Sequence, residues 1–213
     1  MGLGSIAEYM ERYAGKEGVI DAIDMKLENV EYVRSQVAGK NINTYCMDIK
    51  DIAQLNRKYD LLHARFVFEH IKDRKDVLLL LKKNMNENGL LIVEDAVYDD
   101  IEYNGTGNFK KLMYEYAEYI KSTSCNTSYL WGKEMYSVAQ ECDFRHIKTY
   151  DYIRVFRGGG FEAEYWQNCF EELRDKLVKR GVSSSLVSDV NKELEDSNLI
   201  FSGPAIFSIV CQK

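Results

Sequence analysis

Proline is nearly absent from this sequence. Pro204 is its single proline, so no proline-rich linker divides the 213 residues. Long apolar runs are absent as well: the longest covers residues 77–81, whereas a membrane-spanning helix needs about 20 apolar residues. The N-terminus has neither the basic nor the apolar region of a signal peptide. These absences favour a cytoplasmic protein that does not bind membranes.

Cysteines are few and widely spread. Five are present, and no two of them form a Cys-x-x-Cys pair. An odd number without that spacing indicates neither a disulfide framework nor a zinc site. We therefore expect reduced thiols, most of them packed in the core, and no metal ion.

Positive charge is scarce relative to negative charge. The formal net charge is −6, and no run of basic residues is longer than two. An acidic surface repels phosphate groups, so binding to nucleic acid or to an anionic membrane is not expected. Apolar residues make up 46% of the chain, which suits one domain spanning residues 1–213.

Apolar residues recur with the spacing of alternating helices and strands. Strands are predicted at residues 19–24, 42–48, 59–64, 90–93, 149–156 and 205–211. Helices are predicted at about 6–13, 27–37, 76–86, 109–120, 133–142, 166–177 and 185–195. Such alternation argues for an α/β fold whose parallel sheet is covered by helices on both faces.

Three turn signals set element boundaries in this prediction. Ser5 and Glu8 have the spacing of a capping box at the start of the first helix. The pair Asn88–Gly89 is expected to stop the helix at 76–86. Gly203–Pro204 is expected to introduce the last strand.

Glycines and strand-end acids follow the order of a nucleotide-binding site. Gly2 and Gly4 precede the first helix, where glycine lets the backbone approach a ligand and the helix N-terminus attracts negative charge. Asp24 ends the next strand 20 residues after Gly4, close to where nucleotide-binding folds place a ribose-binding acid. Asp48 ends the following strand at the same sheet edge. A flexible start for the glycines and a helix cap for each aspartate are the plainer interpretations.

Two segments resemble the class I S-adenosylmethionine-dependent methyltransferases. Residues 59–71 (YDLLHARFVFEHI) look like the fourth motif of that family, and residues 88–95 (NGLLIVED) look like its turn and fifth strand. The resemblance implies a Rossmann-like sheet, mostly parallel with an antiparallel C-terminal strand, and S-adenosylmethionine as the cofactor. It also implies methyl transfer to a small-molecule acceptor, which it does not identify.

The resemblance assigns cofactor-binding roles to the glycine loop and the next strand. Gly2 and Gly4 would be the last two glycines of the cofactor-binding loop. Asp24 would bind the ribose hydroxyls, since a carboxylate can accept from two hydroxyls at once. Met25 would lie against the adenine.

Further cofactor roles fall on the two strands that follow. Asp48 would accept a hydrogen bond from the adenine amino group, with Ile49 beside the ring. Arg65, just past the fourth-motif strand, would lie near the methionine end of the cofactor.

Methyl transfer requires an acceptor aligned with the methyl carbon, and a general base helps when the acceptor is a hydroxyl. His70, just after the fourth-motif strand, is the candidate base, with a packed or helix-start histidine as the alternative. Asp95, Tyr98 and Tyr103 are candidates for the acceptor pocket. A helical insertion at about 99–131 is expected to cap that pocket. Ordinary core packing is the alternative for the tyrosines.

One element of the family pattern is missing from this sequence. Family members have a whole strand, an acidic residue and a glycine before the position that matches Gly2. Without that strand, two interior strands would expose unpaired N–H and C=O groups. A start assigned too far downstream, an inactive truncated relative, and a gap filled by another segment all stay open. We expect weak or no cofactor binding by the chain as written, and the gap invites strand exchange or homo-oligomer formation.

Two other functions compete with a small-molecule methyltransferase. The missing strand suggests a non-catalytic methyltransferase-like remnant or partner subunit. An NAD(P)-dependent oxidoreductase on a related fold is less favoured. Its fingerprint needs a third glycine near the positions of Ala7 and Glu8, and it gives Asp48 and Arg65 no role.

Overall fold

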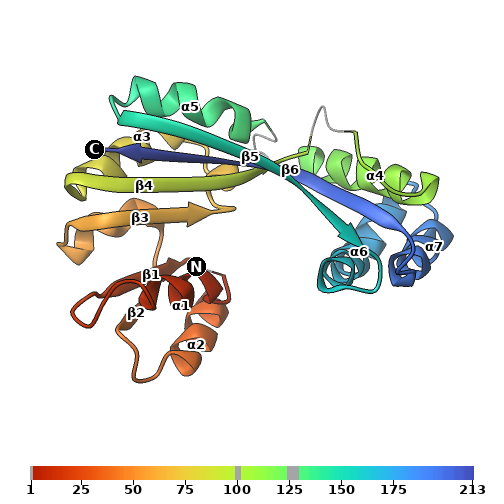
Figure 1. Ribbon diagram of the computed structural model, residues 1–213, viewed down its shortest axis with the longest axis horizontal. Coiled ribbons are helices and arrows are strands. Elements are labelled where there is room, and N and C mark those ends of the chain that lie inside the picture. Colours follow the sequence, from red (N-terminus) through yellow and green to blue (C-terminus); the bar gives the residue numbers. More distant parts are fainter. Residues whose placement is uncertain (1, 99–101, 124–129) are drawn as a thin grey trace.

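The computed structural model describes residues 2–98, 102–123 and 130–213. Two lobes are joined by a pair of long strands that run through both (Figure 1). The strands are β1 (Ile20–Asp24), β2 (Ile42–Cys46), β3 (Tyr59–Arg65), β4 (Met85–Val97), β5 (Arg145–Arg157) and β6 (Ile200–Gln212). The helices are α1 (Ser5–Glu11), α2 (Leu27–Gln36), η1 (Ile49–Leu55), η2 (Phe68–His70), α3 (Arg74–Lys83), α4 (Gly107–Thr123), α5 (Trp131–Glu141), α6 (Phe161–Lys179) and α7 (Ser184–Glu195). Every predicted helix and strand overlaps an observed one.

The strand pairing confirms the predicted α/β architecture. β1 and β2 pair in parallel across α2, and β3 and β4 pair in parallel across α3. Parallel neighbours need such a crossover, because a tight turn cannot join them. β6 pairs antiparallel with both β4 and β5, which gives the order β3-β4-β6-β5. The sheet therefore combines parallel strands with an antiparallel C-terminal strand, and helices flank it on both sides (Figure 1).

The parallel strands fall into two separate sheets. β1 and β2 form one sheet, and no backbone ladder joins β1 to β3 in the described part of the chain. A side-chain contact joins them instead. Asp21 of β1, whose side chain is 2% exposed, pairs with Arg57 at 2.9 Å and accepts a hydrogen bond from the Tyr59 hydroxyl at 2.9 Å. This contact tethers the two sheets where a ladder does not.

Each lobe has its own hydrophobic core. In the first lobe, Phe68, Leu78 and Trp131 are among the fully buried side chains between the sheet, α3 and α5. In the second lobe, α4, α6 and α7 pack around the far ends of β5 and β6, with Phe109 and Phe170 at the centre. The lobes thus share strands but not a core.

The helical cap predicted at 99–131 is described in part. Its helix α4 lies in the second lobe beside α6 and α7, which follow it by many residues. Residues 99–101 and 124–129 lie outside the described residues. The cap and the single-domain boundaries stay predictions.

No helix in the described ranges is both long and apolar enough to cross a membrane. Within the same ranges, no group of three or more histidine, cysteine, aspartate or glutamate side chains is placed to hold a metal ion. Four described cysteines are free thiols: Cys46, Cys142, Cys169 and Cys211.

The capping box predicted at Ser5 and Glu8 is wrong. Gly4, with φ 83°, takes the cap position, and no side chain caps the helix. Ser5 is already the first helical residue, so its hydroxyl lies one position too late to satisfy the free N–H groups.

The turn predicted at Asn88–Gly89 lies inside a strand. α3 ends at Lys83 and β4 begins at Met85. Asn88 has φ 65°, and the register between β3 and β4 shifts at this end of the ladder. A bulge takes up the extra residues without ending the strand, so this turn signal marks an irregular position in β4.

The signal Gly203–Pro204 also lies inside a strand, because β6 begins at Ile200 and continues to Gln212. The register between β5 and β6 shifts beside it, between Ile153 and Val155. Proline has no N–H to donate to a ladder and is accepted at such irregularities. The predicted start of the last strand at residue 205 is therefore too late.

Candidate functional site

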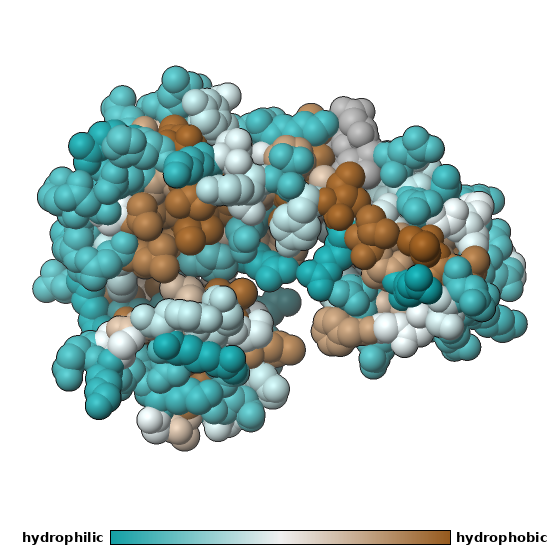
Figure 2. Space-filling view, in the orientation of Figure 1, coloured by the Kyte–Doolittle hydropathy of each residue, from teal (hydrophilic) through white to brown (hydrophobic). Residues whose placement is uncertain are grey.

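The carboxyl ends of the parallel strands face the second lobe (Figure 1). Arg65 at the end of β3 stands opposite Glu94 of β4, and Asp24 at the end of β1 stands opposite Cys46 of β2. Ligands of parallel α/β sheets bind at this edge. Figure 2 shows the surface hollowed between the two lobes beside it. The edge and the hollow together form the candidate site.

The glycine loop and the first strand-end acid are in direct contact. The Gly2 N–H donates to Asp24 Oδ2 at 2.9 Å, although the two residues are 22 positions apart. The Lys26 N–H donates to Oδ1 at 2.9 Å, and the Asn29 amide donates to Oδ2 at 3.2 Å. Partial burial raises the pKa of Asp24, but these three donors outweigh it, and the pKa is lowered. Asp24 is thus an ionised hydrogen-bond acceptor at neutral pH.

The two glycines of this loop have different surroundings. Gly2 and Gly4 both have positive φ, 55° and 83°, a region that L-residues with a side chain rarely adopt. A Cβ on Gly4 would lie 2.9 Å from a methyl carbon of Val33, whereas one on Gly2 would meet nothing within 4 Å. Gly4 therefore packs against Val33 of α2 with no room for a side chain, whereas Gly2 faces open space.

The residues predicted to surround adenine lie at the ends of β1 and β2. Met25 is 70% exposed. Asp48 accepts a hydrogen bond from the Lys50 N–H at 2.9 Å and so caps η1, which is what the plainer interpretation of this residue predicts. Ile49 is half-buried and packs against the core of the first lobe. Adenine binding by these residues stays a prediction.

Arg65 extends from the sheet edge toward the second lobe. Its guanidinium lies 5.0 Å from the centre of the Phe66 ring. Burial raises the pKa of Tyr165 in α6, and the charge of Arg65 opposes that rise. The guanidinium is therefore within electrostatic reach of a helix in the other lobe, and its contact with the cofactor stays a prediction.

His70 is at the surface of the site. The His70 side chain is 65% exposed, and its Nε2 lies 3.4 Å from Glu69 Oε1. Burial is the largest cause that lowers the pKa of His70, and the positive charges of Arg74 and Lys26 lower it further. A lowered pKa favours the neutral ring that a base requires. His63 instead pairs with Glu94 at 3.0 Å.

Two buried carboxyl groups lie deeper, Glu69 in η2 and Asp95 near the carboxyl end of β4. Asp95 is 0% exposed and Glu69 is 7% exposed. Burial, and then the charge of Glu69, raises the pKa of Asp95 to about 8. Burial raises the pKa of Glu69 to about 7, against the charge of Arg74. At neutral pH this pair holds about one proton between its two members.

Each buried acid keeps one oxygen without a hydrogen bond. The Val67 N–H donates to Asp95 Oδ1 at 3.1 Å. Among the described residues, Asp95 Oδ2 and Glu69 Oε2 have no hydrogen-bond partner of normal geometry. A buried polar atom without a partner is unfavourable by about 1–3 kcal/mol. The Trp131 indole N–H, which also has no partner of normal geometry among the described residues, acts on the Asp95 carboxyl. Glu69 Oε2 is therefore the oxygen at which a donating ligand would remove that cost.

Tyr98 and Tyr103, the predicted pocket tyrosines, lie in different environments. Tyr98 follows β4, and its ring lies 5.9 Å from that of Tyr116 in α4. Burial, then Tyr116 and Glu69, raises the pKa of Tyr98. Tyr103 is fully buried in the second core, and its hydroxyl donates to the Tyr98 carbonyl at 3.2 Å. The structure thus brings Tyr98 to the acids and packs Tyr103 behind it; the pocket role of both stays a prediction.

The sequence reasoning assigned no role to Glu69 or Tyr165. Glu69 directly precedes the candidate His70, and its place in residues 59–71 was the available signal. Tyr116 and Tyr165 come from α4 and α6. Burial raises the pKa of each, and the charge of Glu69 adds to that rise. These tyrosines complete a site with acids from one lobe and aromatic rings from the other.

Sequence comparison places the chain among methyltransferases. Residues 2–162 match a protein family described as methyltransferase domain. A malonyl-[acyl-carrier protein] O-methyltransferase of Acetivibrio thermocellus is 32% identical over 169 residues, which are 78% of this chain and 56% of that protein. The chain therefore spans little more than half the length of this relative.

Solved structures share the fold. One is a Bacillus halodurans C-125 protein whose name assigns it to the methyltransferases. Its structure has a TM-score of 0.60 to this chain at 11% identity, and the match covers 99% of this chain and 90% of that one. A plantazolicin methyltransferase, solved with a triazolic desmethylPZN analog and SAH, has a TM-score of 0.53 at 13% identity, covering 99% and 74%. At such low identities the likeness establishes the α/β fold and nothing more.

Proposed function

This chain belongs to the methyltransferase domain family, among the class I S-adenosylmethionine-dependent methyltransferases, and we propose that it transfers a methyl group to a small-molecule acceptor. The contact between the Gly2 N–H and Asp24 carries the proposal. It joins the glycine loop to the ionised strand-end acid at the edge where such folds bind nucleosides. Together with the family match, it favours methyl transfer over an NAD(P)-dependent oxidoreductase.

The residues at the edge fit S-adenosylmethionine. Asp24 stays ionised at neutral pH because N–H donors lower its pKa, so it can accept hydrogen bonds from ribose hydroxyls. Gly2 leaves open space where a side chain would stand. Met25 follows the end of β1, and Asp48 and Ile49 follow the end of β2; we propose that they surround the adenine. When bound, the cofactor supplies a methyl group activated on a sulfonium.

The arrangement of the lobes suits transfer to a small acceptor. Arg65 and Glu69 lie on the sheet side, and the charges of both affect the pKa of Tyr165 in α6. An acceptor between the lobes would be held close to the methyl carbon, and proximity of that kind supplies much of the rate. The relatives do not fix the acceptor, since one is named for malonyl-acyl-carrier protein and the other for plantazolicin.

Binding of S-adenosylhomocysteine tests the proposal. We expect titration calorimetry to detect binding, weakly because β1 and β3 are not paired in the described residues. Asp24→Ala should weaken it at least about tenfold, the effect of losing one charged hydrogen bond of roughly 1.5 kcal/mol or more. Asp175→Ala, an exposed acid on α6, is the matched control. Absence of binding to the wild-type chain, or equal binding by Asp24→Ala, would refute the proposal.

The separation of β1 from β3 favours one second candidate, a non-catalytic methyltransferase-like subunit. The facing edges of these strands are not joined to each other in the described residues, and unpaired strand edges attract further strands. Strand exchange between copies would then occur here. Light scattering on a size-exclusion column tests this: a concentration-dependent dimer without S-adenosylhomocysteine binding supports the second candidate, and a monomer that binds the cofactor argues against it.

A further inference from the structure

Glu69 stands where the two lobes meet, and the two oxygens of its carboxyl group have different surroundings. Its Oε1 lies 3.4 Å from His70 Nε2, and its Oε2 has no hydrogen-bond partner in the described part of the chain. The residue is 7% exposed. An acid this deeply buried with one unsatisfied oxygen is prepared for a donor that the protein itself does not supply.

Groups from four elements lie within electrostatic reach of this carboxyl. Asp95 of β4 and Arg74 of α3 are on the first lobe. The charge of Arg74 lowers the pKa of Glu69 against the effect of burial, and the charge of Glu69 adds to the rise that burial causes in the pKa of Asp95. Tyr116 of α4 and Tyr165 of α6 are on the second lobe, and both respond to the charge of Glu69. The Arg74 guanidinium is held on the backbone beside Glu69: its Nε donates to the Phe68 carbonyl at 2.8 Å and its Nη2 donates to the Glu69 carbonyl at 3.2 Å.

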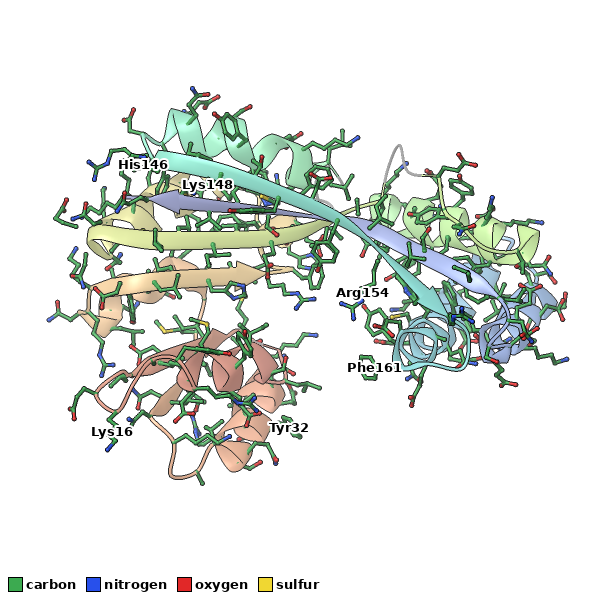
Figure 3. The ribbon with its side chains drawn as sticks, viewed as in Figure 1. Lys16, Tyr32, His146, Lys148, Arg154 and Phe161 are labelled. Atoms are coloured by element: carbon green, nitrogen blue, oxygen red, sulfur yellow. The ribbon has the colours of Figure 1, made fainter. Side chains whose placement is uncertain are left out.

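The second-lobe side of the site is aromatic. Tyr165 is 52% exposed and lies 5.4 Å from Trp166, centre to centre, whereas Trp166 and Tyr116 are buried behind it in the second core. Phe161, at the start of α6, is 80% exposed and lies on the side toward the first lobe (Figure 3). Aromatic rings attract cations through their faces. A carboxylate on one side and aromatic rings on the other are the chemistry that recognises an ammonium group.

We propose that the methyl acceptor is a small amine and that Glu69 binds its ammonium group and takes its proton. This inference rests on the proposed methyltransferase function and names the substrate class of the same site. A carboxylate acceptor is disfavoured, because a further negative charge beside two buried acids would be strongly repelled. Glu69 then touches the reacting nitrogen, with His70 outside it at the surface.

The step balances without any further reactant. One N–H proton moves to a Glu69 oxygen, which leaves the nitrogen lone pair free to attack the methyl carbon. The N–C bond forms as the S–C bond breaks, and its electron pair stays on sulfur. Asp95, already protonated for the most part at neutral pH, keeps the pair from carrying two negative charges in the ground state. The proton leaves Glu69 to water when the methylated amine departs.

Three probes of one shape test this inference with the full chain: phenethylamine, 2-phenylethanol and 3-phenylpropanoate. Binding is measured by saturation-transfer NMR without cofactor, and methyl transfer is measured with S-adenosylmethionine labelled on the methyl group. We expect the amine to bind and to be methylated at least tenfold better than the other two. Glu69→Gln should lower amine binding and transfer at least tenfold, and Glu69→Asp should restore part of the rate. Glu141→Gln, in a surface pair with Lys75, is the control.

The possible outcomes distinguish a failure of this inference from a failure of the proposed methyltransferase function. Wild-type transfer should fall as acid neutralises Glu69, and Glu69→Gln should lose this dependence while keeping its affinity for S-adenosylhomocysteine. Equal amine binding by wild type and Glu69→Gln, or preference for the carboxylate probe, overturns the inference. If no variant binds S-adenosylhomocysteine, the proposed function fails, and the NMR arm still decides whether Glu69 recognises an amine.

Discussion

Replacing Gly4 by alanine tests the packing that brings the glycine loop to the sheet. Gly4 has φ +83°, where a residue with a side chain is strained by about 1–2 kcal/mol. The added Cβ would lie 2.9 Å and 3.0 Å from the two methyl carbons of Val33, a side chain that is 1% exposed. Overpacking a buried site is unfavourable by about 1–3 kcal/mol. We therefore expect Gly4→Ala to lower the free energy of unfolding by about 2–5 kcal/mol.

Gly39 offers a matched control for this substitution. It has the same φ of +83°, and a Cβ there would meet nothing within 4 Å. Gly39→Ala should therefore lose about 1–2 kcal/mol, the backbone strain alone. Urea denaturation followed by circular dichroism gives both values from the midpoints at a shared slope. The difference between the two variants measures the contact with Val33.

A second variant asks whether the clash is with Val33 itself. Val33→Ala removes the two methyl carbons that the new Cβ would meet. The double variant with Gly4→Ala should then lose less than the sum of the two single losses, by about 1–3 kcal/mol. Equal losses for Gly4→Ala and Gly39→Ala, or strict additivity in the double variant, would refute the close packing of the loop on α2.

Two further predictions concern buried acids. Arg57→Ala should lower the free energy of unfolding by about 3 kcal/mol, because it leaves the buried Asp21 carboxylate, which is 2% exposed, without its charge partner. Asp21→Ala leaves an arginine that is 45% exposed and the Tyr59 hydroxyl without their shared partner, and should lower it by about 1–3 kcal/mol. A loss under about 1 kcal/mol for Arg57→Ala in urea melts would contradict the tether. The folded-state pKa of Asp95 is raised to about 8, so its contribution to stability is fully present below the unfolded pKa near 4 and is lost as pH rises toward 8. Asp95→Asn should therefore flatten the fall in stability between pH 5 and 8, and a wild-type slope in this variant would count against the burial of that carboxyl.

The secondary structure followed from the sequence because most helices and strands bury one patterned face. β5 is the instructive exception. It was predicted at 149–156 and runs from Arg145 to Arg157. Nearly all of its residues are exposed, since it is an edge strand that pairs with β6 alone. Without a buried face, its ends carry no periodic signal, and its extent is set by the ladder to β6.

The residues of the candidate site also differ in whether the local sequence or only long-range contacts determine their place. Asp24 could be found because its distance from Gly4 and its place at a strand end are properties of the sequence. Glu69 lies in the recognised segment 59–71, but its burial could not be predicted there, because the Asp95 carboxyl of β4 and the tyrosines of α4 and α6 that its charge affects are far away in the sequence. Tyr103 shows the opposite case: an aromatic residue near a site has the same sequence signal whether it lines a pocket or, as here, fills a core.

The two sides of the site are held by different parts of the fold. Asp95 lies within β4 and Tyr98 follows that strand, so one continuous segment fixes the acid and the first aromatic ring relative to each other. Tyr116 and Tyr165 instead depend on how α4 and α6 pack in the second core. Substitutions in that core can therefore move the aromatic side without moving the acids. We therefore expect substitutions in the second core to change the affinity for the apolar part of the acceptor, and substitutions of Glu69 in η2 to change the recognition of its ammonium group.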